Sequence, residues 1–120
     1  MIEFVIKYDI TGKDGMNKIW SGSHWTHRAK LADKWRLLTM EATQKIPKRT
    51  FENPVFIEFM FESNLDIDNN HPIVKEIIDS LVKLGWIVND TRKHVVGYSV
   101  RFKEDEEFEG KGVKVKVVEV

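Results

Sequence analysis

The sequence predicts one small α/β (α+β) domain, with a mixed β-sheet of about four strands, two main helices and the order β-α-β-α-β-β. Two observations predict this fold class. Four short stretches have strand-like composition or alternation, and two longer ones carry apolar residues at helical spacing. The chain is also only 120 residues long and 42% hydrophobic, which suits a single domain over residues 1–120 that buries about two thirds of its unfolded surface.

The four predicted strands differ in their pattern. Residues 54–62 are rich in β-branched and aromatic side chains, and residues 112–119 alternate clearly between apolar and polar side chains. Residues 2–8 and 94–103 supply the first and the third strand. We expect the acidic turn over residues 104–110 to join the last two strands as a hairpin.

The first predicted helix covers residues 25–45, where polar residues surround an apolar stripe made of Trp25, Ala29, Ala32, Trp35, Leu38 and Ala42. We expect the tryptophans on this stripe to lie in the core rather than to stack on bases. Residues 45–50, broken by Pro47, form a linker to the next strand, and its basic side chains are candidates for phosphate contacts.

The second predicted helix covers residues 73–84, with apolar side chains at helical spacing and Gly85 at the position of a C-terminal cap. Lys75 lies on its polar face. The simpler interpretation of Lys75 is an ion pair with Asp79, one helical turn further on. The functional interpretation places the ammonium beside a carboxylate cluster, where it binds the scissile phosphate or stabilises the leaving oxygen.

The chain contains no cysteine, so it has neither a disulfide framework nor a thiolate metal site. It also shows no long apolar run and no signal-like N-terminus. We therefore expect a soluble, cytoplasmic protein that does not associate with membranes.

Positive charge is segregated along the chain although the formal net charge is +0. Residues 18–49 hold eight Lys or Arg against two acidic residues, whereas residues 50–120 hold nine basic against fourteen acidic ones. Histidine and tryptophan side chains are interleaved with the basic stretch, so it is a candidate surface for a nucleic-acid backbone. The candidate DNA contacts are Asn17, Lys18, Arg28, Lys30, Lys48 and Arg49. A solvated helix face is the alternative.

Acidic residues predict a divalent metal site. Asp66-Ile67-Asp68-Asn69 follows a predicted strand, and Asp90 follows the second helix. If the strand conformation continues, Asp66 and Asp68 point to the same side, and Asp90 can supply a third carboxylate. Mg²⁺ would relieve the repulsion between them, because it prefers hard oxygen ligands.

Other interpretations of the acidic and histidine residues remain open. Asp66 and Asp68 are equally suited to a turn or a helix start, a view that Pro72 supports. A calcium loop of the EF-hand type is excluded, because the positions that need Gly and Glu hold histidine and isoleucine. The histidines are weaker candidates: His24 and His27 for a second metal site, and His71 and His94 for a base or a phosphate contact.

The acidic motif, the helix with an early lysine and the Gly85-Trp86-Ile87-Val88-Asn89-Asp90 segment together resemble the RusA-like Holliday junction resolvases. Asn17-Lys18-Ile19-Trp20 is similar to a further segment of that family. The resemblance implies that Mg²⁺ or Mn²⁺ is bound by Asp66, Asp68 and Asp90, and that the catalytic residues are these three aspartates with Lys75.

The resemblance also implies a homodimeric endodeoxyribonuclease that resolves four-way DNA junctions by paired symmetric nicks, in recombination and repair. A chain this small with this motif resembles those encoded by phages and prophages. Two alternatives stay open: a nuclease for other branched DNA, such as flaps and forks, and a non-catalytic DNA-binding or assembly protein on the same fold.

Overall fold

A computed structural model gives the structure of residues 1–11 and 25–120. Its element order is β1 (Ile2–Lys7), α2 (Trp25–Thr43), β2 (Val55–Glu62), the 3₁₀ turn η2 (Ile67–Asn70), α3 (His71–Lys83), β3 (Val95–Phe102) and β4 (Gly112–Glu119). The predicted order β-α-β-α-β-β is therefore confirmed. Each predicted strand and helix is present, with ends that differ from the prediction by at most two residues.

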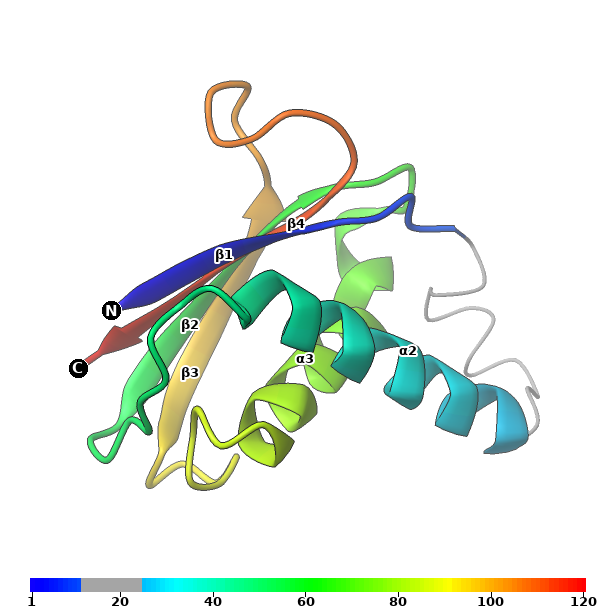
Figure 1. Ribbon diagram of the computed structural model, residues 1–120. Helices are drawn as coiled ribbons and strands as arrows, with labels where there is room; N and C mark the ends of the chain where they lie inside the picture. Colours follow the sequence, from blue (N-terminus) through cyan, green and yellow to red (C-terminus); the bar gives the residue numbers. More distant parts are fainter. Residues whose placement is uncertain (12–24) are drawn as a thin grey trace.

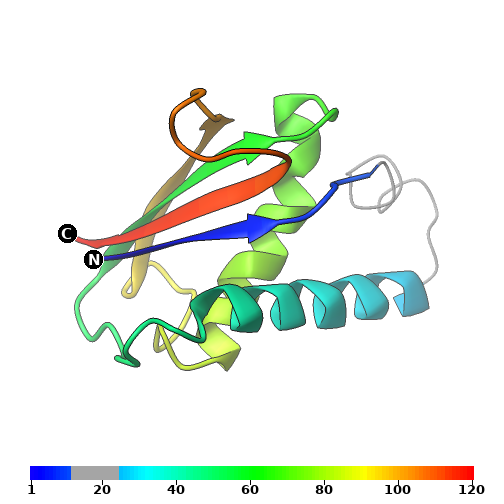
Figure 2. The same cartoon turned by 45° about the horizontal axis from the view of Figure 1, so that its top comes forward.

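The four strands form one mixed sheet in the order β1-β4-β2-β3. Strand β4 runs antiparallel to both of its neighbours, and β2 runs parallel to β3. Helix α3 provides the crossover between the two parallel strands, as parallel pairs require. Both helices lie on the same side of the sheet in Figure 1 and Figure 2.

The predicted hairpin between the last two strands is wrong. Strand β2 lies between β3 and β4, so the connection over residues 103–111 crosses the end of β2 and brings the chain back into the middle of the sheet (Figure 1). The acidic turn was correctly recognised as a connection. Its length and composition carry no information on which strand the returning chain pairs with.

The core lies between the sheet and the two helices. Alternate residues of the central strands are fully buried, among them Ile57, Phe59 and Phe61 of β2 and Val113, Val115 and Val117 of β4. Trp35 of α2 is 1% exposed and forms part of the same cluster, which confirms its predicted place in the core. In the described part of the chain, no helix is long and apolar enough to cross a membrane.

Helix α2 also buries two threonines that the apolar stripe did not include. Thr39 and Thr43 are 0% and 4% exposed. Each hydroxyl donates a hydrogen bond to the backbone carbonyl four residues earlier, at 2.7 Å to Trp35 and 2.8 Å to Thr39. Since these bonds satisfy the buried hydroxyls inside the helix, threonine can occupy core positions here.

Candidate functional site

Asp66 and Asp68 lie in a tight turn between β2 and α3. The extended conformation ends with β2 at Glu62, and residues Ile67–Asn70 form the 3₁₀ turn η2. Both aspartate side chains are exposed, and Asp66 makes no side-chain capping hydrogen bond although it occupies the N-cap position of η2. Pro72 lies in the first turn of α3, as the turn interpretation predicted.

Asn70 fixes this turn, and the sequence pattern does not reveal it. Its side chain is 0% exposed, its amide donates to the carbonyl oxygen of Asp66 at 3.2 Å, and its Oδ1 accepts from the hydroxyl of Ser63 at 3.2 Å. Two asparagines, Asn69 and Asn70, follow Asp68, and the acidic motif in the sequence ends with Asn69. Only the packing of the turn shows that Asn70, and not Asn69, is the buried residue that holds it.

Lys75 extends from the second turn of α3 with a side chain that is 69% exposed. Its ammonium donates a hydrogen bond of 2.9 Å to Oδ2 of Asp79, so the predicted ion pair is confirmed. This hydrogen bond is the main reason that the pKa of Lys75 is raised; partial burial opposes it, while the charges of Asp79, Glu76 and Asp90 add to it. Lys75 is therefore a cation at neutral pH, suited to binding a phosphate and unsuited to acting as a base.

A groove between α3 and β3 brings Lys75 and Asp90 together. His71, Asp79 and Tyr98 line it as well, and its apolar wall is formed by Val74, Ile78 and Val95. Across the groove, Nδ1 of His71 lies 3.5 Å from the hydroxyl of Tyr98. Residues from the two ends of the crossover thus share one surface, with a cation, two carboxylates and an imidazole around an apolar wall.

A second groove separates α2 from α3, and four cations are among the residues that line it. Arg28 and Arg36 project from α2, and Lys75 and Lys83 from α3, with Glu76 and Asp79 between them. Burial is the main cause of a raised pKa at Glu76, which the lysine charges oppose. Lys75 and Asp79 line both grooves, so they form the ridge between them.

The three aspartates do not meet at one point. Asp66 and Asp68 lie before the first turn of α3, whereas Asp90 belongs to the connection that leaves its last turn (Figure 1). Because β2 and β3 are parallel neighbours, the end of β2 and the start of β3 lie at opposite ends of the strands. Among the described residues, no three carboxylate, imidazole or thiol side chains are grouped as a metal site. The predicted set of ligands does not fit a single ion in this arrangement.

The candidate DNA contacts have different surroundings. Asn17 and Lys18 lie outside the described residues, while Arg28 and Lys30 are exposed on the first half of α2. Lys48 donates to the carbonyl of Leu84 at the end of α3, and its ammonium lies 4.5 Å from the centre of the Trp86 ring. This lysine therefore supplies the last turn of α3 with a cation and a donor.

Arg49, the neighbour of Lys48, has partners within the chain too. It forms an ion pair with Glu119 of β4, and its guanidinium carbon lies 4.3 Å from the centre of the Phe51 ring. Lys48 and Arg49 are thus both engaged in contacts that hold the fold together. A phosphate would have to compete with these contacts.

The histidines add one unusual group. Nδ1 of His94, just before β3, is buried and has no hydrogen-bond partner among the residues that the structure describes. The side chains of His24 and His27 lie outside the described part of the structure.

No model of a known protein family matches the chain, and no curated protein matches it either.

Proposed function

We propose that this chain is a metal-dependent, structure-specific DNA endonuclease that resolves four-way junctions by paired symmetric nicks, with Mg²⁺ or Mn²⁺ as its cofactor. The proposal includes a homodimer, because two symmetric nicks need two active sites. Its support is the sequence motif of Asp66, Asp68, Lys75 and Asp90, together with the groove that Lys75 and Asp90 line in common.

The observation that carries the proposal is the meeting of Lys75 and Asp90 in one groove. These residues are fifteen positions apart in sequence, and the charge of Asp90 contributes to the raised pKa of Lys75. The exposed ammonium can bind a phosphodiester by charge, and the neighbouring carboxylate then lies next to the bound phosphate. Arg28 and Arg36, across the second groove, extend the positive surface along α2.

The metal assignment rests on the sequence motif alone, because among the described residues the three aspartates do not form one set of ligands. Bound Mg²⁺ would activate water and neutralise charge at the phosphate. The residues themselves account for binding, because Lys75 holds the phosphate. The carboxylates of Asp66, Asp68 and Asp90 repel a phosphate unless a cation lies between the carboxylate and the phosphate.

The separation of the aspartates favours a second candidate function, a DNA-binding or assembly protein that does not cut. Such a protein would use Lys75 and the arginines of α2 without any catalytic centre. A third possibility keeps the chemistry and changes the substrate to flaps or forks, because junction shape is selected by the dimer and its loops rather than by the acidic motif.

Cleavage of an end-labelled four-way junction in Mg²⁺ or Mn²⁺, beside a flap and a linear duplex of the same sequences, tests the proposal. We expect paired symmetric nicks in the junction, abolished in Asp68→Asn and kept in Asp105→Asn, an exposed aspartate in the connection between β3 and β4. Preferential flap cutting would change the substrate assignment. Junction-specific binding without cleavage in either metal would replace the enzyme with the binding protein.

A further inference from the structure

The free edge of strand β3 carries an unusual amount of apolar surface. Val96, Tyr98 and Phe102 are 50%, 44% and 47% exposed. They are three of the eight large apolar side chains that are exposed among the described residues. Tyr98 leans towards the helix side of the sheet, where its ring packs against Phe59 and His71.

The opposite edge of the sheet is protected in the usual way. Strand β1 buries Ile2, Phe4 and Ile6 and presents Glu3 and Lys7 to solvent. Exposed charges of this kind prevent edge-to-edge pairing. Strand β3 has no proline and no acidic residue, and its one charged residue, Arg101, is paired with Glu107 of the same chain, so this protection is weaker at its edge.

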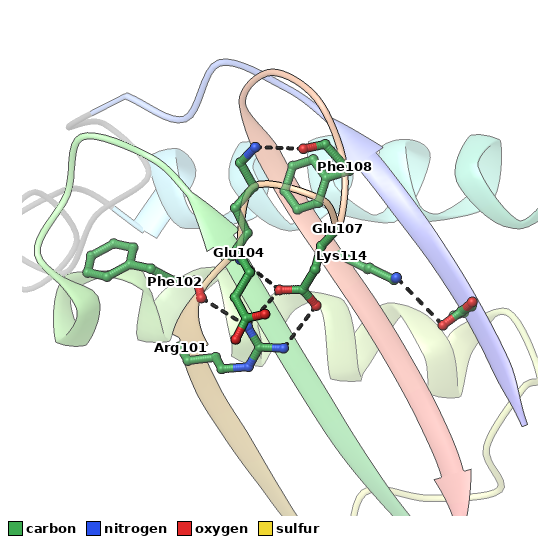
Figure 3. A network of polar contacts seen from close by, with 8 residues as sticks. Arg101, Phe102, Glu104, Glu107, Phe108 and Lys114 are labelled. Atoms are coloured by element: carbon green, nitrogen blue, oxygen red, sulfur yellow. Dashed lines mark hydrogen bonds and ion pairs between the residues drawn. The ribbon is translucent and has the colours of Figure 1, made fainter.

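The charges near the edge of β3 are already compensated within the chain, as Figure 3 shows. Arg101 donates two hydrogen bonds to the carboxylate of Glu107, at 2.7 and 2.9 Å, and Lys103 donates to the carbonyl of Phe108 at 2.6 Å. A second copy of the same edge would therefore meet little net charge. The exposed apolar side chains can approach their equivalents without a penalty from like charges.

The backbone of β3 also fixes which residues can pair at the free edge. The N–H of Lys103 donates to the carbonyl of Phe61 in β2, so the backbone groups of Arg101, Ser99 and Gly97 also point to β2. The N–H and C=O groups of Tyr98, Val100 and Phe102 point outwards. Phe102 keeps one acceptor position free, because its carbonyl has two lone pairs and accepts one bond from Arg101.

We propose that β3 pairs antiparallel with β3 of a second copy, centred on Ser99, so that the two sheets join into one continuous sheet across a two-fold axis. In this register Tyr98 faces the partner's Val100, and Val96 faces the partner's Phe102. On the other face, Arg101 lies opposite the partner's Gly97, which has no side chain to crowd it. Every large apolar side chain of the edge then has an apolar partner, and no two like charges are opposed.

The paired β3 edges would be the interface of the homodimer in the proposed function. The interface rests on the proposed function only for the existence of that homodimer. The two are tested by different measurements, because association is measured without DNA or metal and cleavage is measured with both. The pairing also places the groove between α3 and β3 of one copy next to the same groove of the second copy, on the same side of the joined sheet.

Sedimentation velocity of the full chain tests the surface. We expect a dimer at micromolar concentration that becomes a monomer in Tyr98→Lys and in Val96→Lys. Leu37→Lys is the matched control, because Leu37 on α2 is 51% exposed and lies on another element. Circular dichroism verifies that each variant is folded. A monomeric wild type, or a dimer that both β3 variants leave intact, would overturn the surface.

Disulfide trapping tests the register, since the natural chain has no cysteine. Residues that face each other across a non-hydrogen-bonded antiparallel pair have Cα atoms about 4.5 Å apart, within the range of a disulfide. We expect Ser99→Cys to give a covalent dimer under mild oxidation, and Gln44→Cys, on an exposed residue after α2, to remain unlinked. A dimer that depends on Tyr98 but is not trapped at position 99 would show that the register is wrong.

Discussion

The ammonium of Lys75 donates a hydrogen bond of 2.9 Å to the carboxylate of Asp79, one helical turn away. This pair forms the ridge between two grooves, one lined by Asp90 and Tyr98 and the other by cations of α2. Asp79 is therefore the group with which a phosphate competes for Lys75. The ion pair therefore determines where the Lys75 ammonium lies and how readily it can bind a phosphate.

The first prediction concerns DNA affinity. We expect Lys75→Met to weaken binding to a four-way junction about ten- to hundredfold, because a hydrogen bond to a charged group is worth about 1.5–3 kcal/mol. Asp79→Asn should strengthen binding, because it removes the competing carboxylate. Fluorescence anisotropy over a salt series measures both effects, and the salt slope should fall by about 0.9 for each phosphate that the variant no longer neutralises. Lys7→Met on β1 is the control, and an equally weakened affinity there would contradict the assignment.

The order of elements was predictable because each one shows its own periodicity. The pairing of the strands was not, because a strand pattern does not encode its neighbour. Strand β4 carries Lys114 and Lys116 on one face, which is compatible with an edge strand, yet it lies inside the sheet between β1 and β2. The position of β4 depends on interactions between distant residues, which a single sequence does not display.

The candidate site was predictable only in part. The ion pair of Lys75 and Asp79 follows from helical spacing alone, and its presence is confirmed. The prediction that Asp66 and Asp68 share one side assumed a continuing strand. Instead the chain turns, because the buried amide of Asn70 bonds the backbone of Asp66. A side chain that acts through burial leaves no spacing signal in the sequence.

The second prediction concerns this turn. We expect Asn70→Ala to lower the free energy of unfolding by about 1–3 kcal/mol, since it removes the buried side chain that bonds the carbonyls of Asp66 and Ile67. Urea denaturation measures the decrease. Asn64→Ala, at an exposed position in the same connection, should change stability by about 0.5 kcal/mol or less. A wild-type midpoint for Asn70→Ala would show that the hydrogen bonds of Asn70 do not hold the turn.

The third prediction is a pH dependence from Glu107. Its hydrogen bonds with Arg101, and then with the backbone of Glu104, lower its pKa to about 2 from the usual 4.5. The folded state thus binds the proton less readily than the unfolded state, and the stabilisation is complete above pH 4.5 and is lost as the pH falls from 4.5 towards 2. We expect Glu107→Gln to cost about 1 kcal/mol at pH 7, because the Arg101 side chain is 46% exposed and solvent screens the pair.

Thermal unfolding of the wild type and of Glu107→Gln between pH 7 and pH 3 measures this dependence. The difference between the two melting temperatures should narrow as the solution is acidified below pH 4.5. Glu106→Gln, an exposed neighbour in the same connection, is the control and should follow the wild type throughout. A difference that stays constant with pH would mean that the ion pair does not contribute to stability.

The fourth prediction separates two glycines at the start of β4. Both have positive φ, +80° at Gly110 and +144° at Gly112, but only Gly112 is crowded: a Cβ there would lie 2.0 Å from the carbonyl oxygen of Ile6. Gly110→Ala should cost about 1–2 kcal/mol, the strain of a left-handed residue with open space around it. Gly112→Ala should cost well above that, because it also forces β1 away from β4 at the Lys7–Gly112 pair.

Urea denaturation ranks the two variants, and amide hydrogen exchange of β1 identifies the cause. In Gly112→Ala the amides of β1 that bond to β4 should exchange faster, whereas in Gly110→Ala they should keep their protection relative to the rest of the sheet. Equal decreases in stability would mean that backbone strain alone determines the cost. In that case the close approach of β1 to Gly112 would not be what requires glycine at this position.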